Sequence, residues 1–134
     1  MLTCLALAAA LSASNVAEIP TLSAKIEAEA RALTAETQVT SSLISRIDDF
    51  SADAMRLSGL LHVADVGQDM PCIFQGIAKD ARRRTAELIA ADSQSERDDA
   101  LMNLHVLMDD AAMIAPIAAI AAQDRAEQSD VAQP

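Results

Sequence analysis

One histidine lies where its neighbours on a helix could help it to bind a metal. Met102, His105 and Asp109 follow one another at steps of three and four residues, so a helix would place all three on one side. An imidazole and a thioether can ligate copper or a haem iron, and the Asp109 carboxylate could orient the ring. Ordinary packing explains the same spacing, with Met102 in the core and His105 at its boundary. We therefore predict no resident cofactor and keep metal or haem binding by these three residues as an alternative hypothesis.

No other pattern in the chain favours catalysis. The sequence contains no zinc-protease, di-iron, calcium-loop, phosphate-loop, nucleophile-elbow or dinucleotide motif, and no C-x-x-C pair. The side chains of adjacent acidic residues, such as Asp109 and Asp110, point about 100° apart on a helix and cannot chelate together. Three consecutive arginines, 82–84, are interpreted as a solvated helix face balanced by Asp80 and Glu87. We expect a protein without enzymatic activity.

Composition indicates one small helical domain. Half of the 134 residues are apolar, there is no Trp or Tyr, and Gly and Pro occur only three and four times. A β-sandwich or barrel would need more turn residues and more aromatic side chains. The formal net charge of −10 argues against binding to nucleic acid or to an anionic membrane.

The N-terminal segment has the layout of an export signal. Residues 1–17 carry no charge, and the apolar stretch from Leu2 to Leu11 is followed by small and polar residues. Candidate cleavage sites end at Ser12 and Ser14. The stretch is shorter than the roughly 20 residues of a membrane span, so no stable span is expected after cleavage. We predict a periplasmic or secreted protein. No Lys or Arg precedes the apolar stretch, so a cytosolic protein that retains residues 1–17 is the alternative.

The stretch from Thr21 to Val66 has helical periodicity and contains no Pro. Its apolar or small residues recur at steps of mostly three and four: Ile26, Ala30, Leu33, Thr37, Thr40, Ile44, Ile47, Ala54, Leu57 and Leu61. This predicts either one long helix or two helices separated near Asp48–Ser51, where Ser51 could cap the second.

Two further helices are predicted after Gly67, which suits the C-terminal end of a helix. The first runs from Pro71 to Ala91, and the second begins after Ser95, which with Asp98 resembles a capping box. Pro116 should kink or split the last helix, which is expected to end near Gln123. The expected buried face of the first of these helices is Ile73, Phe74, Ile77, Ala81 and Leu88.

The predicted fold class is therefore all-α. The predicted domain, residues 18–128, is an antiparallel three- or four-helix bundle with a long first helix. The signal segment precedes this domain, and a disordered tail at 129–134 follows it. The weak apolar stripe of residues 22–44 should pack either on 111–123 or on a second copy of the chain. We expect an exported protein that acts through contacts with a protein partner or by self-association, including a homodimer.

Overall fold

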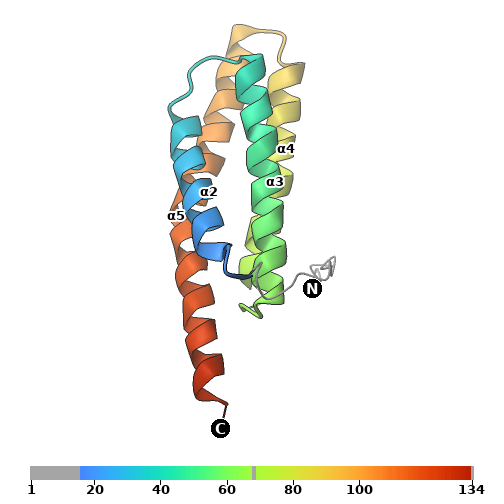
Figure 1. Ribbon diagram of the computed structural model, residues 1–134. Helices are drawn as coiled ribbons and strands as arrows, with labels where there is room; N and C mark the ends of the chain where they lie inside the picture. The colour runs from blue at the N-terminus through green and yellow to red at the C-terminus, as the bar shows by residue number, and fades with distance from the viewer. Residues whose placement is uncertain (1–15, 68, 134) are drawn as a thin grey trace.

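The computed structural model describes residues 16–67 and 69–133, which form an antiparallel bundle of four α-helices (Figure 1). The helices are α2 (Ile19–Thr34), α3 (Ser41–Val63), α4 (Asp69–Ala90) and α5 (Gln94–Val131). Within these ranges no residue lies in a strand. The prediction of an all-α bundle is confirmed in its four-helix form. The predicted signal segment, apart from residues 16 and 17, lies outside the described residues, and export stays a prediction.

The expected long first helix is wrong, because α2 ends after 16 residues and a connection at Ala35–Thr40 separates it from α3. The Thr40 hydroxyl accepts a hydrogen bond from the Leu43 backbone N–H at 3.1 Å, so Thr40 caps α3 instead of joining the apolar seam. The alternative break at Asp48–Ser51 is also wrong. Ser51 is buried inside α3, and its hydroxyl donates to the Ala78 carbonyl of α4 at 2.8 Å.

The connection between α3 and α4 turns at Asp65 and not at the expected Gly67. Asp65 has φ of 55°, the left-handed conformation that usually favours glycine. The Val66 N–H donates to the Leu61 carbonyl and the Asp65 N–H to the His62 carbonyl, both at 3.1 Å. This is a Schellman C-cap, and the buried Val66 side chain supplies its apolar contact.

Helix α4 matches its predicted range closely, whereas α5 differs from the prediction at its start and in its length. Ser93, not Ser95, caps α5, and it forms a complete capping box with Glu96. Pro116 lies inside the helix without splitting it, and α5 continues beyond Gln123 as far as Val131. Figure 1 shows the last turns of α5 projecting past the other helices.

Each helix packs mainly on one other helix, α2 on α5 and α3 on α4. Helix α2, which holds part of the 22–44 stripe, thus packs on α5, the helix that contains the expected partner segment 111–123. The buried residues of α2 are Ile19, Leu22, Ser23, Ile26, Ala30 and Leu33. They face a side of α5 that is rich in alanine, with Ala111, Ala112, Ala115 and Ala118 all buried. Small side chains let the two helices pack closely, so the weak stripe of α2 still excludes water.

Candidate functional site

His105 contacts the backbone of the segment before α3, and the other two predicted ligands lie at the surface. Its Nε2 lies 2.8 Å from the Glu36 carbonyl oxygen, which can only accept, so Nε2 carries the proton. His105 thereby links α5 to the connection between α2 and α3. Met102 is 60% exposed and Asp109 is exposed, which places both in solvent and not in the bundle core.

The second histidine lies too far away to complete a site. His62 is exposed in the last turn of α3, whereas His105 contacts the segment just before the first turn of that helix. The 23 residues of α3 separate the two levels by roughly 30 Å at 1.5 Å per residue. In the part of the chain that the structure describes, no group of three or more His, Cys, Asp or Glu side chains could hold a metal ion. Metal or haem binding by His105, Met102 and Asp109 stays a prediction.

The outward side of α5 carries an apolar stripe that we call the outer face. Its members are Met102, Val106, Met113, Ile117 and Ile120, which are 60%, 59%, 71%, 51% and 59% exposed. Large apolar side chains scattered singly over a surface are common, but an aligned set is typical of interaction sites. The spacing of four, seven, four and three residues keeps the five side chains on one side of the helix.

The opposite side of α5 is also apolar, because it forms part of the core with residues such as Leu104, Met108 and Ala115. With apolar residues on two sides, α5 is by length and composition apolar enough to cross a membrane, the one such helix in the described ranges. A third of that apolar window is buried inside the bundle.

Carboxylates surround the outer face. Helix α5 contains eight acidic residues and two basic ones, Arg97 and Arg125. The acidic residues are Glu96, Asp98, Asp99, Asp109, Asp110, Asp124, Glu127 and Asp130. Among the described residues, none of these eight carboxylates is within 4.0 Å of a basic group. Glu96 is engaged at the helix start, where the backbone N–H groups of Asp92 and Ser93 donate to it and lower its pKa.

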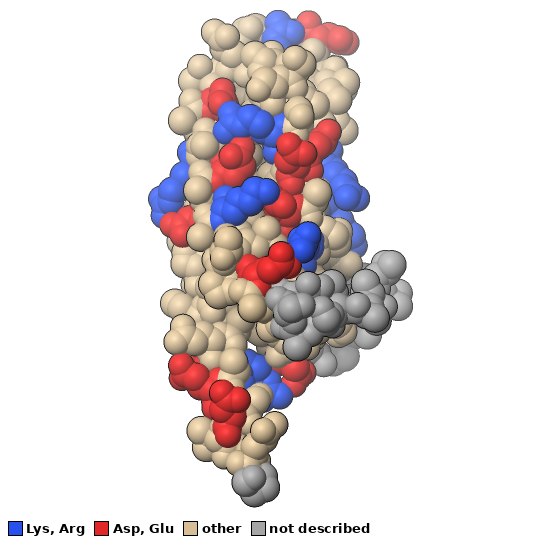
Figure 2. Space-filling view, viewed as in Figure 1, with Lys and Arg blue, Asp and Glu red and all other residues tan. Residues whose placement is uncertain are grey.

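The face formed by α2 and α3 is different, because its charges are paired across the two helices. Figure 2 shows basic and acidic side chains intermixed on this face. Lys25 pairs with Asp53 at 2.6 Å, and Arg56 pairs with Glu18 at 2.7 Å. The hydrogen bond and the charge of Asp53 raise the pKa of Lys25. Several charges on α2 and α3 therefore pair within the bundle, whereas the carboxylates of α5 face solvent.

Arg46 adds a third bridge between these helices, because it binds Glu29 at 2.8 Å and also contacts Glu36. The hydrogen bonds to the two carboxylates raise its pKa. Two of the arginines at 82–84 pair with the expected acids, Arg83 with Asp80 at 3.5 Å and Arg84 with Glu87 at 2.8 Å.

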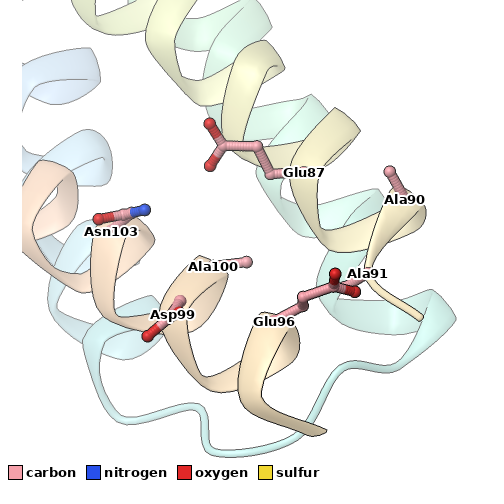
Figure 3. A pocket seen from close by; sticks show the side chains of 7 residues that line it. All are labelled: Glu87, Ala90, Ala91, Glu96, Asp99, Ala100 and Asn103. Carbon is pink, nitrogen blue, oxygen red and sulfur yellow. The ribbon is translucent and has the colours of Figure 1, made fainter. Parts of the chain in front are cut away.

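A shallow groove runs between α4 and α5 beside the outer face. Figure 3 shows its upper hollow, where Glu87 of α4 points across toward α5. The hollow is lined by Glu87, Ala90, Ala91, Glu96, Asp99, Ala100 and Asn103. A second hollow shares Asn103 with the first and is lined in addition by Asp80, Arg84, Val106, Leu107 and Asp110. Val106 belongs to both the groove and the outer face, so the two surfaces are continuous.

The sequence of α5 carries a signal for the outer face. The spacing of Met102 from His105 and Asp109 suggests only a metal ligand or a core residue. Two interleaved stripes on opposite sides, 102–106–113–117–120 and 101–104–108–111–115, indicate a helix that is apolar on both sides. Which stripe faces the core depends on how the helices pack.

The chain matches no protein-family model, and searches of curated proteins and of solved structures gave no match. Fold and surface chemistry are therefore the basis for a functional assignment.

Proposed function

We propose that the chain is a non-enzymatic helical bundle that binds a protein partner through the outer face of α5. The observation that carries this proposal is the alignment of five large apolar side chains, each at least half exposed, on one side of a packed helix. Leaving such a stripe in water has a cost in free energy and solubility that a binding role explains.

The chemistry of these side chains suits binding and not catalysis. Met, Val and Ile supply contact area and have no proton or nucleophile to contribute. Met102 and Met113 have flexible, polarizable side chains that adapt to the shape of a partner. A helix or a helical pair from the partner would cover the stripe in the way that amphipathic helices complete bundles.

Export remains part of the proposal and rests on the uncharged, apolar N-terminal segment. The mass of the native protein tests it directly. Loss of the residues up to Ser12 or Ser14 supports export, whereas a native chain that starts at Met1 supports the cytosolic alternative.

Site-specific photocrosslinking tests the binding role. A benzophenone side chain would replace Ile117 on the outer face or, as a matched control, Ile89 on α4, which is 68% exposed and lies outside that face. We expect a discrete crosslinked product from position 117 in native cells and none from position 89. The product should disappear when Met113→Ser is added. Equal labelling from both positions, or none from 117 in a folded protein, would contradict the proposal.

A further inference from the structure

We infer that the partner presents a basic amphipathic helix, with an apolar stripe that seats on the outer face of α5 and Lys or Arg residues on both sides of that stripe. This inference rests on the proposed function, and it names the chemistry of the partner.

The geometry of α5 sets the apolar part of the match. At about 100° per residue, the five residues of the outer face fall within an arc of about 60°. From Met102 to Ile120 the stripe covers 19 residues, and its ends are 18 residue steps or roughly 27 Å apart. These dimensions match one side of a single helix of about five turns.

The carboxylates set the sign of the partner's charge. By the same helical geometry, Asp98 and Asp109 lie along one edge of the stripe, and Asp99 and Asp110 lie along the other. The α4–α5 groove adds Glu87 on the second edge. None of these carboxylates except Glu87, which binds Arg84, lies at ion-pair distance from a basic group of the described residues. Lys or Arg side chains at the edges of a partner helix would therefore meet carboxylates on both sides.

The same charges disfavour the two other occupants of an apolar face. A second copy of the chain would bring its own α5 carboxylates against these, and juxtaposed like charges disfavour association. An anionic lipid surface attracts basic helices, whereas the outer face is edged by acids. A cationic helix is the occupant for which apolar contact and charge act together.

Binding of synthetic helical peptides to the purified full chain tests the inference. The first peptide has 18 residues, with a Leu stripe flanked by Lys. The second replaces every Lys with Glu, and the third keeps the composition of the first but scrambles the stripe. Calorimetric titration at low and high salt gives the affinity of each. We expect the Lys peptide to bind, and the Glu peptide and the scrambled peptide to bind at least tenfold more weakly. High salt should lower the affinity of the Lys peptide.

Matched variants separate this face from the general acidity of the chain. Asp109→Asn with Asp110→Asn removes two charges beside the stripe, and Asp48→Asn with Asp49→Asn removes two exposed charges from α3. The first pair of substitutions should lower the affinity for the Lys peptide about fivefold, because each exposed ion pair contributes little. The second pair should change that affinity less than twofold. Met113→Ser with Ile117→Ser should weaken binding about thirtyfold, and Ile89→Ser should not.

The outcomes also distinguish the two proposals. If the Lys peptide and the Glu peptide bind equally well, the inference about the partner's charge fails and the binding role stands. The same holds if neither of these two peptides binds while crosslinking from position 117 persists. If the folded protein also gives no crosslinked product from position 117, the charge inference and the binding role both fail. Equal weakening by the α3 and α5 variants would also overturn the inference. A stable dimer in sedimentation that Ile117→Ser dissociates, or tighter binding to anionic vesicles than to the Lys peptide, would replace the basic helix by another occupant.

Discussion

Replacing Ile117 with alanine should leave the bundle folded, whereas the same replacement at Ile47 should destabilise it strongly. Ile117 is 51% exposed on the outer face and Ile47 is 0% exposed in α3. Both lie inside helices, so the gain in helix propensity, at most about 0.7 kcal/mol, is similar at the two positions. The difference between the two variants therefore isolates burial.

The burial of each side chain gives the expected magnitudes. Truncating a fully buried isoleucine to alanine costs about 2–5 kcal/mol, since it removes apolar contact and leaves a cavity. At Ile117 about half of the apolar contact is at stake and no cavity forms, so the cost is about 0.5–1 kcal/mol and is largely offset by propensity. We expect the free energies of unfolding of the two variants to differ by about 2–4 kcal/mol.

Urea unfolding followed by circular dichroism at the helix band measures this difference. With a slope of about 1–3 kcal/mol per molar urea, Ile47→Ala should lower the midpoint by at least about 1 M, and Ile117→Ala by no more than a few tenths. Each titration would be repeated at two protein concentrations. The reasoning is refuted if Ile117→Ala costs as much as Ile47→Ala, or if the parent midpoint rises with concentration and that rise is lost in Ile117→Ala. Either result would mean that the outer face is already covered in the purified protein.

Substitutions at four further positions test individual parts of the fold. Ser93→Ala should lower the free energy of unfolding by about 1 kcal/mol, measured by urea unfolding, because α5 loses its N-cap. Backbone N–H groups lower the pKa of Glu96, so its contribution to stability is present above the usual carboxyl pKa and is lost as pH falls through the lowered pKa. The stability difference between the parent and Glu96→Gln, measured by urea unfolding, should therefore shrink as the pH is lowered below the usual carboxyl range. His105→Ala removes the hydrogen bond to the Glu36 carbonyl and should lower the free energy of unfolding by about 1 kcal/mol. It should also speed amide exchange at Ala35–Thr40 in hydrogen-exchange mass spectrometry. Unchanged exchange would contradict the role of His105 in holding this connection to α5. Asp65→Gly should be more stable than Asp65→Ala by about 1 kcal/mol in thermal unfolding. Both variants lose the ion pair with Arg125, but only glycine adopts the left-handed conformation of residue 65 without steric cost. Equal stability would argue against the C-cap.

Features that depend on neighbours along the chain follow from the sequence alone. The scarcity of Gly and Pro and the three-to-four spacing of Leu and Ile predicted helices, because side-chain periodicity is a local property of the backbone. The range of α4 and the pairing of Arg83 and Arg84 with Asp80 and Glu87 followed from the same rule. Local sequence does not distinguish between competing helix N-caps. Thr40 and Ser51, like Ser93 and Ser95, offer similar hydroxyl groups, and only their surroundings select one.

Which apolar residues are core and which are surface depends on how the helices pack against one another. Helix α5 has two apolar stripes, and the sequence cannot say which one meets α2, because both could exclude water equally well. The packing of α2 on the alanine-rich side buries that side and leaves Met102, Val106, Met113, Ile117 and Ile120 in solvent. His105 was likewise assigned by packing, since its partner Glu36 is 69 residues away in the chain. Local spacing specifies the faces of a helix, and contacts between distant segments determine which of those faces remains available to a partner.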